Sequence, residues 1–311
     1  MSEDMKKDTD IRTDYFPILN KLLFQAFEIS PFDSLCSILR VGGMSDANWD
    51  PFEESRKAFD DFNWILDKSL SERSNETSRR IALLMYCQAI EMTAPHEIIA
   101  NILRCILKEG YVIDPFEHLA RRNKKKLFSY IPPSAKIKFQ HIKESARKVG
   151  EQELIDKIDS FFDENIRNAF SHSDYIFSDE YFRFREGGLA RQIHLEELDR
   201  KVQACFGFYG AFMSLHRRWL IELSKSKRFH KWPRYEVLEI LSSKEEGVYG
   251  FNVHFSNGSK ATYTRRQSGI RTINLHFDKN GHIGFMVGDL DALKPVWKID
   301  GKPVDEWENL E

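Results

Sequence analysis

Apolar residues along the first three quarters of the chain recur every three to four positions, the spacing of helices that bury one face. This spacing predicts helices at residues 16–29, 51–70, 76–93, 95–109, 134–149, 151–171 and 195–224, and a shorter, basic one at 115–125. Proline and glycine support these limits, because Pro31 cannot continue the first helix and Gly110 and Gly150 are typical residues after a helix end. We therefore expect residues 1–228 to form a mostly helical domain.

Alternating sequence predicts strands in two other places. Residues 175–185 alternate on both sides of Asp179-Glu180, and Gly187-Gly188 follow, which is typical of a small β-hairpin at about residues 175–186. From Phe229, short runs rich in β-branched and aromatic residues are separated by turn signals such as Asn257-Gly258. These runs lie at 235–241, 249–255, 261–265, 272–277 and 282–287. The expected fold class is α+β, with a helical bundle that contains the hairpin and then a small antiparallel β domain over residues 229–311.

The composition is typical of a soluble globular protein with a substantial core, since 41% of the 311 residues are hydrophobic and 30% are charged. No apolar run approaches the roughly 18 residues of a membrane span. The polar N-terminus, MSEDMKKDTD, lacks the apolar centre of a signal peptide. The four cysteines stand singly, without a CxxC pair or zinc-site spacing. We expect a cytoplasmic protein without a membrane partner, metal or cofactor, whose cysteines are small buried thiols.

Charge is distributed unevenly along the chain. The formal net charge of −2 excludes a globally basic nucleic-acid binder. Between His118 and Gly150, however, Glu144 is the only acid among ten basic residues: Arg121, Arg122, Lys124, Lys125, Lys126, Lys136, Lys138, Lys143, Arg147 and Lys148. Such a local patch can hold phosphates while the remaining surface repels them, and its first five members are candidate RNA-binding residues. The same residues also fit a solvated face with loop charges, and the sequence leaves both interpretations open.

Residues 167–172, with the sequence RNAFSH, place polar side chains at the end of a strongly amphipathic stretch. If residues 151–171 form one helix of about 100° per residue, the apolar stripe that starts at Leu154 occupies one face. The polar residues then share one flank beside that face: Arg167, Asn168, Ser171 and His172. They form two i,i+4 pairs, Asn168 with His172 and Arg167 with Ser171.

These residue types suit the cleavage of a phosphodiester. Histidine titrates near neutrality, so His172 can take a proton from a ribose 2′-hydroxyl or give one to the leaving oxygen. Arg167 offers a planar, charged fork for the phosphoryl group, and Asn168 can orient the imidazole or contact the phosphate. No metal is required, because the 2′-hydroxyl is an internal nucleophile. Acid–base cleavage usually needs two proton-handling groups, which a two-fold dimer of this flank would supply.

The pattern Arg-Asn-x-x-x-His on a helix resembles the Arg-x4–6-His motif of HEPN domains, and the resemblance covers about residues 76–225. It implies a helical bundle and a metal-independent endoribonuclease, as found in toxin–antitoxin, abortive-infection and other antiviral systems, with the active site between two HEPN units. By position, Arg167 and His172 would be catalytic and Asn168 would support them in the catalytic site, with Ser171 as a further supporting residue. Glu91 is matched to the acidic residue that HEPN domains often carry on an earlier helix.

The expected function is therefore RNA cleavage by a homodimer with a composite active site, which leaves a 2′,3′-cyclic phosphate and a 5′-hydroxyl. A role in stress or phage defence and a neutralising or regulatory partner protein follow from the resemblance alone. Two other interpretations stay open. A catalytically silent HEPN-like dimer would bind RNA or a protein. In a purely structural protein, Arg167 would pair with Asp163 or Glu164, and Ser171 and His172 would cap the helix C-terminus.

Overall fold

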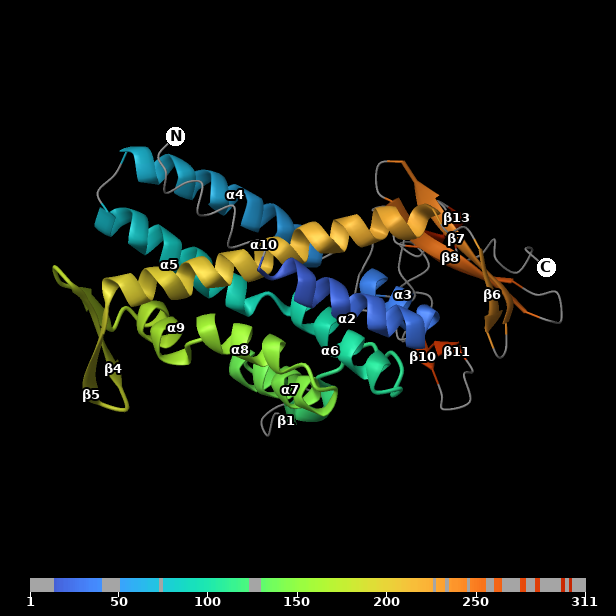
Figure 1. The fold of residues 1–311 in the computed structure, drawn as a ribbon, viewed down its shortest axis with the longest axis horizontal. Coiled ribbons are helices and arrows are strands. Elements are labelled where there is room, and N and C mark those ends of the chain that lie inside the picture. Colours follow the sequence, from blue (N-terminus) through green and yellow to red (C-terminus); the bar gives the residue numbers. More distant parts are fainter. Residues whose placement is uncertain are drawn as a thin grey trace. The chain divides into compact units, whose positions relative to one another are not determined.

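The computed structural model describes residues 14–40, 51–72, 75–122, 130–225, 228–232, 235–244, 247–255, 260–264, 275–277, 283–285, 298–299 and 302–303. The chain is mixed α+β (Figure 1), the fold class predicted from the sequence. It divides into two compact units: unit 1 comprises residues 1–22, 52–103 and 116–213, and unit 2 comprises residues 23–51, 104–115 and 214–311. No helix in the described part of the chain is long and apolar enough to span a bilayer.

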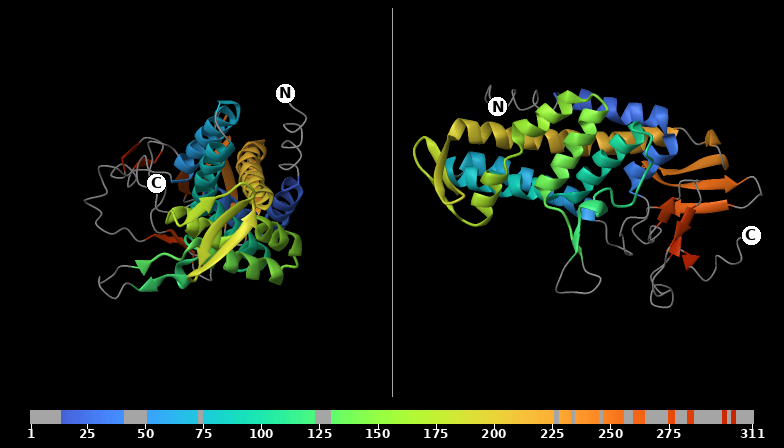
Figure 2. Two further views of the ribbon diagram at one scale, coloured as in Figure 1. Left: turned by 90° about the vertical axis from the view of Figure 1, so that its left-hand side faces the viewer. Right: turned by 90° about the horizontal axis from the view of Figure 1, so that it is seen from below.

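Unit 1 is largely helical. It contains part or all of α2 (Phe16–Ile29), α4 (Pro51–Glu72), α5 (Asn75–Glu91), α6 (Thr93–Ile106), α7 (Ala135–Lys148), α8 (Gln152–Phe161), α9 (Glu164–Ser171) and α10 (Leu195–Lys225). Helices α5 and α10 lie side by side (Figures 1 and 2), where an ion pair of 2.8 Å joins Arg79 to Asp199. The helices predicted around these segments are confirmed, with ends that differ by a few residues, except for the single helix predicted over α8 and α9.

The centre of unit 1 is aromatic. The ring centroid of Phe161, on α8, lies 5.1 Å from that of Phe208 on α10 and 5.7 Å from that of Phe139 on α7. All three side chains are almost fully buried, and burial of each such ring stabilises the fold by roughly 1.5–3 kcal/mol. The last residue of α8 is therefore fixed in the core immediately before α9 begins.

The predicted single helix at residues 151–172 is wrong, because the structure divides it into α8 and α9. Phe162 and Asp163 separate the two helices and have extended backbone angles, with ψ of 117° and 106°. Buried apolar residues line both helices, so the periodicity alone predicts one continuous helix. The helical angles derived from Leu154 consequently do not apply to α9.

The short basic helix predicted at residues 115–125 is also wrong. A single 3-10 turn (Glu117–Leu119) precedes β1 (Arg121–Arg122), which pairs with β2 (Tyr130–Ile131) in an antiparallel ladder. The segment offers few apolar residues for one helical face, and a short helix without tertiary packing is marginal in water.

The predicted hairpin at residues 175–186 is confirmed, and it belongs to a three-stranded antiparallel sheet. Strand β4 (Tyr181–Glu186) lies between β3 (Tyr175–Phe177) and β5 (Leu189–His194). Gly187 and Gly188 both have positive φ, 55° and 85°, as a two-residue turn between antiparallel strands requires. Glycine therefore closes a second hairpin here, and β5 continues into α10.

Unit 2 contains a four-stranded antiparallel sheet in the order β6–β7–β8–β9. Its strands are β6 (Arg228–Trp232), β7 (Tyr235–Ser243), β8 (Gly247–Phe255) and β9 (Lys260–Thr264). Two smaller antiparallel pairs follow, β10 (Leu275–Phe277) with β11 (Ile283–Phe285) and β12 (Lys298–Ile299) with β13 (Lys302–Pro303). Helices give way to strands at β6, close to the predicted change at residue 229, whereas the predicted domain limits of 1–228 and 229–311 stay a prediction.

Helix α3 (Pro31–Leu39), in unit 2, was not predicted. Pro31 does end α2, as expected, but it also occupies the first position of α3, where its missing N–H costs nothing. Phe32 packs against Phe251 of β8, with 5.5 Å between ring centroids. Gly247, at the start of β8, has a φ of 71°, and a Cβ there would lie 2.7 Å from the backbone of Leu220. Only glycine allows this close approach of strand and helix.

Candidate functional site

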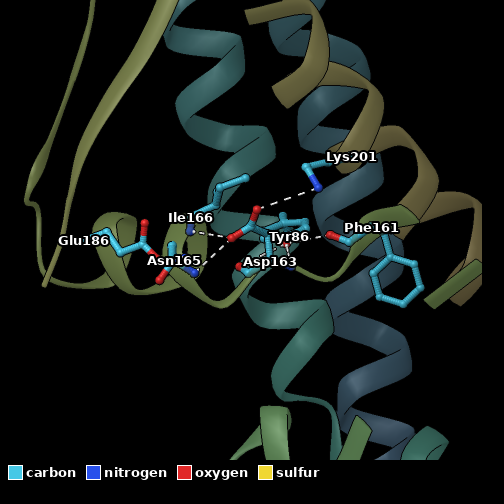
Figure 3. Close-up of polar contacts among 7 residues, drawn as sticks. All are labelled: Tyr86, Phe161, Asp163, Asn165, Ile166, Glu186 and Lys201. Carbon is cyan, nitrogen blue, oxygen red and sulfur yellow. Dashed lines mark hydrogen bonds and ion pairs between the residues drawn. The ribbon is translucent and has the colours of Figure 1, made fainter. Parts of the chain in front are cut away.

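Helix α9 begins at a strong N-cap (Figure 3). Oδ1 of Asp163 accepts hydrogen bonds from the backbone N–H groups of Asn165 (3.0 Å) and Ile166 (3.4 Å). The ammonium of Lys201 on α10 lies 3.7 Å from the other carboxylate oxygen. A carboxylate at this position satisfies free N–H groups and also interacts favourably with the positive end of the helix dipole. The start of the site helix is therefore fixed by one side chain.

Tyr86, on α5, bridges the break between α8 and α9. Its hydroxyl donates to the carbonyl oxygen of Phe161 (2.8 Å) and accepts from the backbone N–H of Asp163 (3.0 Å), as Figure 3 shows. Burial raises the pKa of Tyr86 well above its usual value, so the hydroxyl stays protonated. These two bonds satisfy backbone groups that the interrupted helix would otherwise leave buried without partners.

Asn165 joins α9 to the small sheet. Its Nδ2 donates to Oε1 of Glu186 on β4 at 3.1 Å (Figure 3). Glu186 in turn pairs with Arg191 on β5 at 2.9 Å. Farther along α9, the ring of Phe170 stacks on that of Tyr175 on β3, with 5.4 Å between centroids. The helix is therefore held from α5 at its start and by the sheet along its length.

The guanidinium of Arg167 connects two other predicted site residues. Its Nη2 forms an ion pair with Oε1 of Glu91, the last residue of α5, and its Nη1 donates to Oδ1 of Asn168 at 2.8 Å. The side chains of Arg167 and Glu91 are 32% and 43% exposed, so the pair is open to solvent. The remaining N–H groups of the Arg167 guanidinium have no acceptor among the described residues. The structure thus brings Arg167, Asn168 and Glu91 together.

The partners expected for a purely structural Arg167 are engaged elsewhere. Asp163 lies beside Lys201, and Glu164 pairs with Lys136 of α7 at 2.7 Å. The pairing of Arg167 across to α5 is therefore a property of the fold and does not follow from neighbours on its own helix.

His172 stands at the exposed C-terminal end of α9. It is the C-cap residue, and Ser173 after it has a φ of 55°, in the left-handed region. The backbone N–H groups of Ser173 and Asp174 donate to the carbonyls of Phe170 (3.1 Å) and Ala169 (2.9 Å), the Schellman pattern of helix termination. The C-cap position weighed for His172 is thus confirmed. Among the described residues, no side chain hydrogen-bonds its imidazole, so both ring nitrogens are available to a ligand.

Ser171 is exposed and lies beside the thiol of Cys87 on α5. Burial raises the pKa of Cys87 to about 11, although a hydrogen bond with Ser171 and the charge of Arg167 oppose this shift. The Sγ atom also lies 3.9 Å from the carbonyl oxygen of Arg167. A thiol of this pKa is protonated at neutral pH. Cys87 is buried between α5 and α9.

The candidate RNA-binding segment is described only in part. Arg121 is exposed on β1, and the side chain of Arg122 on the same strand is not described. Lys124, Lys125 and Lys126 lie outside the described residues. A role of this segment in binding RNA stays a prediction.

Several other basic residues of the same stretch have partners of their own. Lys143 pairs with Asp159 at 2.7 Å, and Lys136 has the pair with Glu164 described above. Lys138 is buried and donates to the hydroxyl of Thr93 at 3.0 Å. The two ion pairs and the burial of Lys138 lower the positive charge that α7 presents to a phosphate.

Two residues that shape the site, Asp163 and Tyr86, were not predicted. Asp163 did carry a signal, because aspartate followed by Glu164 is a common helix start, but the apolar stripe running through it favoured a continuous helix. Tyr86 carried no signal, since its contact with residues 161–163 arises only when α5 packs against the break.

Within the described part of the chain, no cluster of three or more His, Cys, Asp or Glu side chains is arranged to hold a metal ion. Comparison with protein-family models, with curated proteins and with solved structures finds no significant match to the chain.

Proposed function

We propose that this chain is a metal-independent endoribonuclease of HEPN type, which cleaves RNA through attack by the ribose 2′-hydroxyl. The contact between Arg167 and Glu91 carries the proposal. The sequence singles out the two residues for different reasons, Arg167 for its spacing to His172 and Glu91 for its place on an earlier helix. Residues 76 positions apart nevertheless meet at one solvent-accessible point.

In the proposed mechanism, Arg167 binds the scissile phosphate. Negative charge grows on the non-bridging oxygens as the 2′-oxygen attacks, and a guanidinium stabilises that charge through paired hydrogen bonds. Glu91 and Asn168 hold the guanidinium in one orientation, so less conformational freedom is lost when the phosphate binds.

His172 is the proposed proton-transfer group. As a base it takes the proton of the 2′-hydroxyl while the 2′-oxygen forms its bond to phosphorus and the bond to the 5′-oxygen breaks. The leaving 5′-oxygen needs a proton from a second group. We propose that His172 of a second copy provides it in a two-fold homodimer, so the products are a 2′,3′-cyclic phosphate and a 5′-hydroxyl.

The test uses purified protein and end-labelled RNA in EDTA. Wild type should cleave, whereas Arg167→Ala and His172→Ala should each lose at least about a hundredfold in rate, as removal of a general acid–base or charge-stabilising group commonly does. Arg147→Ala and His118→Ala are matched controls at exposed positions outside the site and should keep the wild-type rate. A deoxynucleotide at the cleaved position should block the reaction.

Equal cleavage by wild type and both site variants, or cleavage of all-deoxy substrate, would overturn the proposal. Sedimentation of each variant tests whether the oligomeric state is unchanged, which separates loss of chemistry from loss of assembly. A wild type that cleaves while strictly monomeric would refute the composite site.

The second candidate is a catalytically silent HEPN-like dimer that binds RNA or a protein. The observation in its favour is that Glu91 already neutralises Arg167, as in many structural ion pairs. The same cleavage assay separates the two functions, because a binding module forms a stable complex with the RNA and does not cut it.

A further inference from the structure

One face of the β3–β5 sheet carries basic and aromatic side chains that the proposed cleavage does not use. The antiparallel register places seven residues on this outer face: Ile176, Tyr181, Arg183, Arg185, Ala190, Gln192 and His194. Tyr181 is half-buried and the other six are exposed. The opposite face packs inward through Phe182 and Phe184, both buried. The sheet therefore has one packed side and one side open to solvent.

Positive charge is concentrated at the middle of the outer face. Arg183 has no carboxylate partner among the described residues. Arg185 is 72% exposed, and its Nε lies 3.7 Å from a carboxylate oxygen of Asp174, a solvent-exposed contact that holds it weakly. The two arginines are two positions apart on β4, so their Cα atoms are about 6.8 Å apart. They form a short basic row that is complementary to a phosphate backbone.

A pair of rings lies at the end of this row. Tyr181 and His194 are direct neighbours across β4 and β5, with ring centroids 4.4 Å apart and planes 40° from parallel. On the same face, Ile176 is 59% exposed and adds apolar surface. Rings beside a basic row are the usual platform for unpaired bases, because every base has a flat face that can stack on them.

The sheet is joined directly to the site helix. Asn165 of α9 donates to Glu186 on β4, and Tyr175, the first residue of β3, stacks on Phe170. In Figures 1 and 2, β4 and β5 stand next to α9. The outer face is therefore part of a sheet that is fixed to the helix that carries Arg167 and His172.

We propose that the outer face of the β3–β5 sheet binds single-stranded RNA, with its phosphates on Arg183 and Arg185 and its bases on the rings of Tyr181 and His194. The proposal rests on the proposed function in naming the substrate of that site as single-stranded, but binding to the sheet does not require cleavage. Base-paired RNA is not a ligand of this face, because its bases are stacked on one another and their faces are covered.

The experiment measures the fluorescence anisotropy of a labelled, 2′-O-methylated RNA of about 12 nucleotides, a length within the usual range for such surfaces. This RNA lacks the free 2′-hydroxyl and is not cleaved. The double variant Arg183→Gln/Arg185→Gln should bind about tenfold more weakly or worse, and the slope of log K against log salt should fall by about 1.4, or 0.7 per lost phosphate contact. Arg183→Lys/Arg185→Lys keeps the charge and should retain most of that slope.

Arg191→Gln is the matched control. Arg191 is an exposed arginine of the same sheet, but it belongs to the opposite face and pairs with Glu186. Its replacement should leave RNA affinity within about twofold of wild type. Thermal melts of each variant verify that the sheet remains folded.

Three results would overturn the inference: no RNA binding by wild type, wild-type affinity in Arg183→Gln/Arg185→Gln, or a duplex bound more tightly than the single strand. Arg167→Ala and His172→Ala, the site variants of the cleavage assay, separate the proposed function from this inference. If the sheet binds RNA but unmodified RNA is not cut, only the proposed function fails. If unmodified RNA is cut and affinity does not depend on the sheet, only this inference fails.

Discussion

The hydroxyl of Tyr86 accepts a hydrogen bond from the backbone N–H of Asp163 at 3.0 Å and so fixes the residue at which the site helix begins. Tyr86→Phe leaves that N–H and the carbonyl of Phe161 buried without a partner, which should lower the free energy of unfolding by about 2 kcal/mol. Urea denaturation measures the change. Tyr181→Phe is the control, because the Tyr181 hydroxyl makes no hydrogen bond among the described residues. Equal unfolding midpoints for the two variants would contradict the role of Tyr86.

Glu91 and Glu76 offer a matched comparison on one helix. Each forms an ion pair with an arginine: Glu91 with Arg167 on α9, and Glu76 with Arg80 one turn away on α5. Glu91→Gln should slow RNA cleavage by about tenfold to a hundredfold, because Arg167 loses the group that orients it, while stability changes by less than about 1 kcal/mol, as expected for exposed pairs. Glu76→Gln should keep the wild-type rate. Single-turnover kinetics of both variants decide the matter, and an identical loss in both would show that Glu91 has no special role.

Ser173 occupies a position that favours glycine. Its φ of 55° costs a residue with a Cβ about 1 kcal/mol, whereas glycine adopts it freely. Ser173→Gly should therefore raise the free energy of unfolding by about 0.5–1 kcal/mol. Ser173→Ala keeps the Cβ and should give no such gain. Thermal unfolding of the two variants distinguishes backbone strain from loss of the hydroxyl, and a less stable glycine variant would refute the strain.

The buried side chain of His96 makes the free energy of unfolding depend on pH. Burial lowers the pKa of His96 from 6.5 to about 3, with a smaller contribution from the charge of Lys138, and Nε2 shares a hydrogen bond of 2.8 Å with the hydroxyl of Tyr209. The unfolded state therefore binds more protons than the native state between these two values. The stability due to this group is complete above pH 6.5 and is lost as the pH falls towards 3.

At about pH 5 the loss due to His96 amounts to about 2 kcal/mol relative to neutral pH. His96→Gln lacks the titrating group, so its free energy of unfolding should fall less between these conditions than that of wild type. The exposed His118 provides the control, and His118→Gln should follow the wild-type pH dependence. A wild-type stability that is independent of pH over this range would disprove the prediction.

Helical periodicity was sufficient to predict most helices of unit 1, because apolar spacing directly reflects which face a helix buries. It failed where a polar residue changed the backbone without changing the spacing. Asp163 interrupts residues 151–172, yet the apolar positions on both sides keep one phase. Pro31 predicts a helix stop, but proline is equally suited to the first turn of the next helix.

Contacts across the fold account for the rest of the site. The spacing of Arg167 and His172 is visible in the sequence, and the place of Glu91 on an earlier helix is predicted by the apolar pattern. The pairing of Arg167 with Glu91 and the bridge from Tyr86 depend on how α5 packs against α9. No local pattern encodes such packing, since it is set by buried residues of several helices together.

The interruption at Phe162 and Asp163 also affects how the chain tolerates insertions and deletions. In one continuous helix, a residue gained or lost near Leu154 would turn every later side chain by about 100° about the axis. Here α9 starts anew from its own cap, so the angle of Arg167 is counted from Asp163 and not from α8. A residue gained or lost in α8 would therefore change the packing of Phe161 but not the angle between Asp163 and Arg167.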